Sequence, residues 1–151
     1  MSDPTETFRA ELRAWLADNL EPELRAARVA ELPDQERFAA LRRWQARMAA
    51  GRWVGITWPR AYGGRDASIA DQIAYVEEMS RADAPPAVNG LGIGIVGPPI
   101  IAFGNEEQKQ HFAPRILTAE DIWCCGFSEP GAGSDLASLR TLALLDGDEF
   151  V

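Results

Sequence analysis

The sequence predicts a mainly α-helical fold: an N-terminal helical domain with orthogonal, bundle-like packing, followed by the first strands of a truncated antiparallel β domain. Up to residue 120, apolar residues recur every three or four positions, which is the period of amphipathic helices. From residue 121 onward, short β-favouring runs alternate with Gly, Pro and Asp turn residues. We therefore expect a helical domain over residues 1–120 and the incomplete beginning of a β domain over residues 121–151.

The first helix is expected to begin at the segment Asp3-Pro4-Thr5-Glu6. This segment combines a capping residue, a proline at the first helical position and a glutamate close behind it. Apolar side chains then follow at helical spacing and form one face: Phe8, Leu12, Trp15, Leu16 and Leu20. A polar connection over residues 21–32 leads to the next helix.

The second helix is expected to end at Gly51, since glycine readily terminates helices. Its inward stripe contains Phe38, Leu41, Gln45 and Met48. A linker of bulky side chains follows, with Trp53, Ile56 and Trp58, and the turn Tyr62-Gly63-Gly64 closes it. Large aromatic side chains in such a linker favour core packing over a binding site.

A third helix is expected after Ser68, because Ser68 and Asp71 have the spacing of a helix cap. Its apolar stripe is predicted to face the core and consists of Ile69, Ile73 and Val76. Its charged residues are predicted to face water and consist of Glu77, Glu78 and Arg81.

The stretch from Ala84 to Asn105 contains no charged residue. A membrane span is disfavoured because four prolines and several glycines would make a poor lipid-facing helix. We expect instead a helix that is buried on all sides. Glycines along this stretch indicate either close helix packing or room for an extended apolar ligand, and the residues alone do not decide between the two. These glycines are Gly90, Gly92, Gly94 and Gly97.

The same stretch contains the Gly-x-Gly-x-x-Gly pattern of dinucleotide-binding folds, from Gly92 to Gly97. That pattern requires a strand before it and a helix that begins within it, whereas Ala84-Pro85-Pro86 precedes it here. Nicotinamide binding is therefore disfavoured.

A last helix is expected to begin at Asn105, Glu106 and Glu107 and to run past Phe112, Ile116 and Leu117.

The C-terminal part reads as strands and turns. Residues 122–127 form a short apolar run typical of a buried strand, and Ser128-Glu129-Pro130-Gly131 ends it in a tight loop. Such a loop exposes backbone N–H groups that can bind a phosphate or a flat heterocycle, although a plain turn between strands has the same composition. Residues 139–145 predict a second strand and Asp146-Gly147-Asp148 a hairpin turn. Because the returning strand stops at its third residue, we expect the chain to be a fragment.

Composition narrows the classes of partner. The formal net charge of −8 disfavours binding to nucleic acid or to anionic membranes, which clustered Lys and Arg side chains would mediate. The polar N-terminus lacks the apolar core of a signal peptide, so a cytoplasmic location is expected. Cys124 and Cys125 are adjacent, and with His111 as the single histidine they offer too few ligands for zinc. His111 is expected on the surface.

Three motifs resemble those of the flavin-dependent acyl-CoA dehydrogenase family. The most specific is the seven-residue run Glu129-Pro130-Gly131-Ala132-Gly133-Ser134-Asp135, preceded by an aromatic-containing segment. The second runs from Gly51 to Pro59 and closes with Tyr62-Gly63-Gly64, and the third is Gly104-Asn105-Glu106-Glu107-Gln108-Lys109. The resemblance covers essentially the whole chain, as the N-terminal helical domain and the opening of the middle β domain.

The resemblance implies a set of cofactor and substrate residues. FAD would lie along Cys125, Gly126, Phe127, Ser128, Gly133 and Ser134, with the flavin ring nearest Phe127 and Ser128. The acyl-CoA substrate would contact Ser134, Gly94 and Ile95. Two positions depart from the family pattern: Cys125 stands where many relatives have Tyr, and Ser128 where many have Thr, so that the hydroxyl is kept and a methyl is lost.

The resemblance also implies a reaction, in which a carboxylate base removes the α proton of an acyl-CoA while the flavin accepts the β hydride. The base would lie downstream, so no catalytic residue is expected in this chain and the chain alone would be inactive. Glu129 is an in-chain candidate for a base, but a structural role in the loop is favoured. The implied partners are an acyl-CoA, an electron-transfer flavoprotein or similar acceptor, and further subunits in a dimer or tetramer. A non-catalytic helical interaction module is the alternative.

Overall fold

The structure is a computed structural model that describes residues 4–151. In this part of the chain it contains the helices α1 (Pro4–Asn19), α2 (Ala26–Ala30), α3 (Asp34–Ala50), α4 (Ile69–Arg81), α5 (Gly97–Phe103) and α6 (Glu106–Leu117). Short 3-10 turns span Pro22–Leu24, Arg60–Tyr62 and Leu136–Ser138, and a π-helical turn spans Gly92–Val96. The strands are β1 (Leu145–Asp146) and β2 (Glu149–Phe150). The expected mainly α-helical fold class is confirmed.

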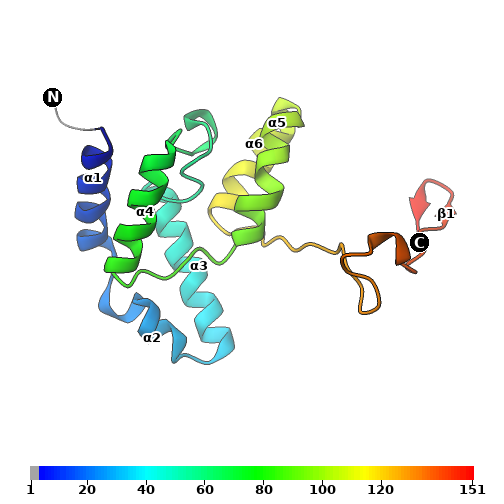
Figure 1. The fold of residues 1–151 in the computed structure, drawn as a ribbon, viewed down its shortest axis with the longest axis horizontal. Helices are drawn as coiled ribbons and strands as arrows, with labels where there is room; N and C mark the ends of the chain where they lie inside the picture. Colours follow the sequence, from blue (N-terminus) through cyan, green and yellow to red (C-terminus); the bar gives the residue numbers. More distant parts are fainter. Residues whose placement is uncertain (1–3) are drawn as a thin grey trace.

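The helices form one body from which the C-terminal residues extend. In Figure 1, α1 and α4 lie side by side at one end of the body, and α5 packs against α6 at the other end. The chain after Trp123 leads away from this body and ends in the hairpin of β1 and β2. None of the helices described here is long and apolar enough to cross a membrane.

The core lies between α1, α3 and the linker that follows α3. Trp44 and Met48 of α3 are fully buried, and the linker residues Trp53 and Trp58 are nearly so, which confirms that the linker packs into the core. The Trp15 ring lies 5.6 Å from the Trp44 ring, a distance typical of aromatic pairs in protein interiors. Helix α3 ends at Gly51 as expected.

Two of the predicted helix starts are confirmed in atomic detail. The Ser68 hydroxyl accepts a hydrogen bond from the backbone of Asp71, and the Asp71 carboxylate accepts one from the backbone of Ser68. Asn105 and Gln108 form the same reciprocal pair at the start of α6. Each pair satisfies two backbone N–H groups that the helix leaves free. The predicted cap of the first helix, Asp3, lies outside the described residues.

The predicted inward face of α4 is wrong, although Glu77 and Arg81 face water as predicted. Ile69, Ile73 and Val76 are exposed, with 78% of Ile69 accessible to solvent, whereas Glu78 is 2% accessible. The buried face of α4 instead carries Ala74, Glu78 and Met79. Apolar spacing gave the correct helix but the wrong face.

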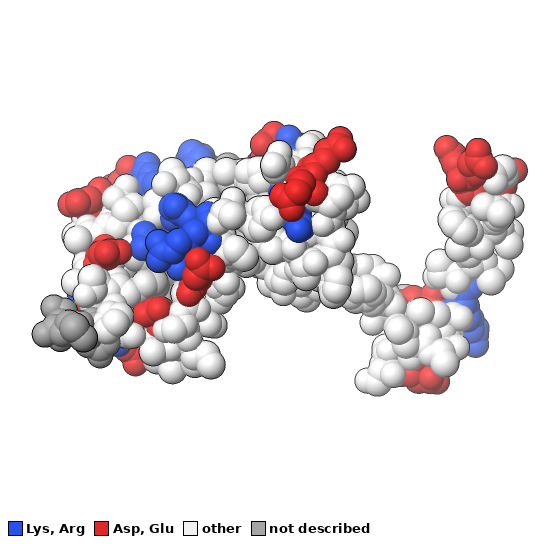
Figure 2. Space-filling view, turned by 90° about the horizontal axis from the view of Figure 1, so that it is seen from above, with Lys and Arg blue, Asp and Glu red and all other residues white. Residues whose placement is uncertain are grey.

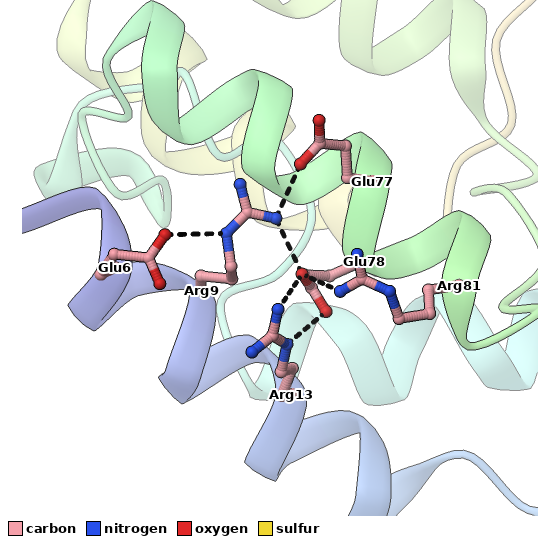
Figure 3. Close-up of polar contacts among 6 residues, drawn as sticks. All are labelled: Glu6, Arg9, Arg13, Glu77, Glu78 and Arg81. Carbon is pink, nitrogen blue, oxygen red and sulfur yellow. Dashed lines mark hydrogen bonds and ion pairs between the residues drawn. The ribbon is translucent and has the colours of Figure 1, made fainter.

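Arginines of α1 explain how an acid can face inward. Figure 3 shows Arg9 and Arg13 of α1 reaching Glu78, with Arg81 bonding it from one turn further along α4. The bonds from Arg13 measure 2.7 and 2.8 Å and form a bidentate pair, which is the strongest geometry for a guanidinium and a carboxylate. A buried carboxylate is stable only when it is paired in this way.

The expected helix over residues 84–105 is also wrong. The chain is irregular around Pro85 and Pro86, turns through the π-helical segment at Gly92, and enters α5 at Gly97. Proline lacks a backbone N–H, so Pro98 and Pro99 suit the first turn of a new helix rather than the middle of a long one. Several apolar residues of the stretch are exposed: Leu91, Ile95 and Phe103. No strand precedes Gly92 in the described part, in agreement with the rejection of a dinucleotide fold.

The predicted strand over residues 122–127 is wrong, and the strand predicted over residues 139–145 is much shorter than expected. Residues 122–127 are irregular, and of the expected strand over 139–145 only Leu145 belongs to β1. The predicted hairpin turn is confirmed, with Leu145 paired to Phe150 and with Gly147 in the left-handed region at φ 63°. A two-stranded ribbon buries little apolar surface. Because the described chain contains no larger sheet, residues 122–127 and 139–144 have none to join.

Candidate functional site

An apolar cleft of about 550 Å³ lies in the helical body. Its walls come from the linker after α3, from α4, and from the segment between Ala84 and Gly94. Residues that contribute apolar surface include Ile56, Met79, Ala87 and Ile93. A cleft of this size and composition suits the apolar body of a small molecule.

The polar groups on the cleft wall are few and uncharged. The Tyr75 hydroxyl donates a hydrogen bond to the carbonyl of Trp53 at 2.9 Å, and burial raises the pKa of Tyr75 to about 12. Gln72 and Thr57 supply the other polar side chains. Because Tyr75 is the only titratable residue among those that line the cleft and stays protonated at neutral pH, the cleft can hold a ligand but offers no acid or base.

Two glycines widen the cleft. A methyl group built on Gly90 or Gly94 would meet no atom within 4 Å, so these positions face open space. Gly97 is small for another reason, since a methyl group there would lie 2.1 Å from the Trp58 ring. The predicted substrate residue Gly94 thus lines the cleft, whereas Ile95 is exposed and does not line it.

The predicted cofactor residues lie on the segment that leaves the helical body. Cys125 is half-buried, whereas Gly126, Phe127, Ser128, Gly133 and Ser134 are exposed. Glu129 and Ala132 exchange backbone hydrogen bonds of 3.1 and 3.0 Å across Pro130-Gly131, which forms the expected tight loop. The segment after Trp123 leads away from the helical body (Figure 1), and none of the predicted cofactor residues lines the cleft.

Glu129 ties the loop to the chain that follows it. Its carboxylate accepts hydrogen bonds from the Thr141 hydroxyl at 2.6 Å and from the backbone N–H groups of Arg140 and Thr141. These bonds, that from the Thr141 hydroxyl foremost, hold the pKa of Glu129 below its ordinary value. A carboxylate used in this way stabilises the loop, in agreement with the structural role favoured for it.

Sequence patterns missed the polar residues that join the cleft wall to the start of the segment that leaves the helical body. Asn89 is buried next to the cleft wall, and its side chain accepts a hydrogen bond from the backbone of Trp123 at 3.0 Å. A single asparagine in an uncharged stretch carries no periodic signal. The only hint in the sequence was Gln45, a polar residue within the inward stripe of the second helix.

On the face that Figure 2 shows, Lys and Arg side chains lie in several groups, the largest of them on the helical body with acidic side chains beside it. No group of three or more His, Cys, Asp or Glu residues in the described chain could hold a metal ion. His111 is exposed, as expected.

Fold and cleft define the chain as a helical domain with an apolar cleft. Solved structures with this fold include the ChsE4-ChsE5 complex from Mycobacterium tuberculosis, with a TM-score of 0.75 and 39% identity over the whole of this chain and 38% of that one. A second is the Tcur3481-Tcur3483 steroid ACAD, with a TM-score of 0.74, 37% identity, and coverage of 99% of this chain and 38% of that one.

Sequence comparison gives the family. The family profile for the acyl-CoA dehydrogenase N-terminal domain matches residues 2–120. Acyl-CoA dehydrogenase IpdE1 of Mycobacterium tuberculosis is 48% identical over 148 residues, and bovine mitochondrial isovaleryl-CoA dehydrogenase (Bos taurus) is 30% identical over 152 aligned positions. The chain therefore belongs to the acyl-CoA dehydrogenase family. The alignments cover 97% and 100% of the chain but only 38% and 34% of these two relatives.

Proposed function

We propose that this chain is the N-terminal portion of an FAD-dependent acyl-CoA dehydrogenase, in which residues 1–120 form the helical domain and residues 121–151 begin the β domain. The observation that carries the proposal is the set of free hydrogen-bond donors on the segment from Cys125 to Ser134. In the described chain, neither the hydroxyls of Ser128 and Ser134 nor the backbone N–H groups of Gly126 and Gly133 have a hydrogen-bond partner.

This donor set fits a flavin nucleotide. Closely spaced N–H groups with small side chains suit the pyrophosphate, and Phe127, which is 65% exposed, offers an apolar surface for the ring. Methyl groups built on Gly126, Gly131 and Gly133 would meet no atom within 4 Å, which leaves space for a ligand to approach the backbone. Bound FAD would supply the hydride acceptor. Ser128 would donate to the ring, and Ser134 would serve both the cofactor and the CoA side of the substrate.

The cleft fits the acyl group of the substrate. Its lining is uncharged, and Gly90 and Gly94 leave open space where larger side chains would narrow it. An acyl chain gains about 0.8 kcal/mol for each CH₂ group that it buries. One structural relative is described as a steroid ACAD, which supports a bulky acyl group as the substrate. Ile95 would contact the acyl group only if the substrate extends beyond the cleft.

Other parts of the reaction are assigned to residues beyond this chain. The cleft wall supplies no carboxylate, and the Glu129 carboxylate is hydrogen-bonded to Thr141. The base that takes the α proton would therefore come from the remaining part of the protein. We propose that an electron-transfer flavoprotein or a similar acceptor reoxidises the enzyme, and that the protein assembles with further subunits in the cytoplasm. The relative described as the ChsE4-ChsE5 complex supports assembly.

The cofactor assignment is tested in the full polypeptide that contains this chain. Ser128→Ala should weaken FAD retention or slow flavin reduction by roughly three- to thirtyfold, because a hydrogen bond contributes about 0.5 to 1.5 kcal/mol and more when a buried partner is left unpaired. Ser68→Ala, at the start of α4, serves as the control and should leave the flavin unaffected. FAD content and single-turnover reduction are measured for both. Equal values for Ser128→Ala and the parent would refute the assignment.

A further inference from the structure

The buried side-chain amides of Gln45 and Asn89 form a hydrogen-bonded cluster next to the cleft segment, which we call the hub. Gln45 is fully buried and Asn89 is 1% exposed. The Gln45 side chain donates to the carbonyls of Ile116 and Leu117 at 3.0 and 2.9 Å and accepts from the backbone of Asn89 at 2.9 Å. This exchange joins α3, the end of α6 and the cleft segment through groups that are all satisfied.

The Asn89 side chain extends the hub toward the cofactor segment. Its amide nitrogen donates to the carbonyls of Ile116 at 3.0 Å and Asp121 at 2.8 Å, and its oxygen accepts from the backbone N–H of Trp123 at 3.0 Å. Only an amide supplies two donors and an acceptor in this arrangement, since a carboxylate has no N–H group.

The bond to Trp123 is the last one before the cofactor segment begins. Within the described residues, no hydrogen bond joins residues 124–128 to the helical body. The Trp123 ring also packs against Phe112 at 5.7 Å, but its buried indole N–H has no partner. The Asn89 amide thus makes the last hydrogen bond to the main chain before Cys125, two residues after Asp121, which Arg115 also holds.

Asn89 is connected to the cleft through its own backbone. Its carbonyl accepts from Ile93 at 3.0 Å, at the π-helical turn, and Ile93 and Gly94 line the cleft. A methyl group on Gly92 would lie 2.5 Å from the Asn89 amide nitrogen, so the turn and the amide are packed directly against each other. Asn89 therefore joins the cleft wall through its backbone carbonyl and the chain just before the cofactor segment through its side chain.

We propose that Asn89 is a positioning residue that holds the cofactor segment, residues 125–134, in register with the substrate cleft. The inference rests on the proposed function, since it assumes that this segment contacts FAD and the cleft holds the acyl group. Asn89 neither lines the cleft nor belongs to the cofactor segment, and its effect would be transmitted through Asp121 and Trp123.

The test compares Asn89→Asp with Leu16→Ala in the full polypeptide. Asn89→Asp keeps the shape of the side chain but removes both N–H donors and turns a carboxylate toward two carbonyls. Leu16→Ala lowers stability by removing buried apolar volume in α1, a helix that makes no hydrogen bond to the hub. Hydrogen exchange of the backbone over residues 121–127 is measured without FAD, and FAD affinity and the flavin absorption spectrum are measured with it.

For Asn89→Asp we expect about tenfold faster exchange at Trp123, about tenfold weaker FAD binding and a shifted flavin spectrum, with smaller changes for Leu16→Ala. Equal effects of the two variants on exchange and on FAD binding would overturn the proposal. Gly92→Ala, which presses a methyl group on the Asn89 amide, should give the same pattern and decides the matter if Asn89→Asp does not fold.

The two proposals fail in different ways. If the parent protein binds no FAD, the proposed function is refuted, and the exchange at Trp123 then decides alone whether Asn89 anchors the segment. If the parent binds FAD and Asn89→Asp changes neither exchange nor affinity beyond the control, the positioning role is refuted while the cofactor site stands.

Discussion

Glu78 shows how one residue can reverse the face that a helix buries. Three arginines bond its carboxylate, and two of them, Arg9 and Arg13, come from α1. The hydrogen bond from Arg13, followed by those from Arg9 and Arg81, outweighs burial and lowers the pKa of Glu78 to about 2. The Glu78 carboxyl is therefore ionised at neutral pH, and its negative charge contributes to the stability of the fold through these arginines.

The low pKa predicts how stability depends on pH. Glu78 is ionised in the folded protein at pH values where it would take up a proton in the unfolded chain, so its contribution is present above about pH 5 and is lost as pH falls toward about 2. The free energy of unfolding of the parent should therefore fall more steeply over this range than that of Glu78→Gln. Urea titrations at several pH values compare the two, and parallel pH profiles would contradict the prediction.

Residue-level patterns predicted some positions and missed others for a physical reason. Apolar spacing found the buried Leu12, Leu16 and Met48, because burial of apolar surface is what that spacing reports. It failed for Glu78 and Asn89, whose burial depends on partners 65 and 34 residues away along the chain. No local pattern contains those partners. The tight loop between Glu129 and Ala132 was predicted because its proline and glycine are contiguous.

At the scale of elements, Gly94 in the π-helical turn and Gly97 at the start of α5 should respond in opposite ways to an added methyl group. Gly97→Ala should destabilise the protein by about 1 to 3 kcal/mol, because its methyl group would overlap the buried Trp58 ring, which cannot move aside easily.

The matched control is Gly94→Ala, where the new methyl group meets open space. It should be neutral or stabilise the protein by up to about 1 kcal/mol, because alanine restricts the unfolded chain. Chemical denaturation of the two variants gives the comparison, and a Gly97→Ala protein as stable as Gly94→Ala would show that the Trp58 contact does not constrain α5.

The capping box of α4 gives a second prediction at this scale. Ser68→Ala should lower the free energy of unfolding by about 1 kcal/mol, since it leaves the Asp71 N–H without its acceptor. Ser80→Ala, at an exposed position within the same helix, should change stability by no more than a few tenths of a kcal/mol. The midpoints of thermal and urea unfolding are measured for both variants. Equal midpoints would show that the cap does not stabilise the protein.

Helices were easier to predict than strands because their hydrogen bonds are local. The caps of α4 and α6 and the end of α3 at Gly51 follow from neighbours within four residues. The strands over residues 122–127 and 139–145 were predicted from composition, but a strand also needs a partner and an apolar cover. The described chain offers a partner only at the hairpin of β1 and β2.

At the scale of the whole molecule, the helical body and the C-terminal segment differ in exposure. Almost every residue after Trp123 is exposed, and the buried core ends before it, apart from Ala132. Trypsin should therefore cut this 151-residue chain first after Arg140, the single Lys or Arg that follows Arg115.

The check is a time course of limited proteolysis followed by intact-mass measurement. A fragment that ends at Arg140 should accumulate before any cut within α1, α3 or α4, and Arg140→Gln should abolish it. Earlier cleavage in those helices would mean that the helical body is less stable than its packing indicates.

The pairing of α1 with α4 also bears on how the protein is made. Arg13 and Glu78 are 65 residues apart. At a synthesis rate of about 5 to 20 residues per second, a ribosome adds Glu78 roughly 3 to 13 s after Arg13. Throughout that delay α1 can pack its apolar face against α3, but its arginines lack the carboxylate that they pair with in the folded protein. The nascent chain therefore cannot complete the pair of α1 and α4 until Glu78 has been translated, and Arg9 and Arg13 are the part of α1 that stays unpaired until then.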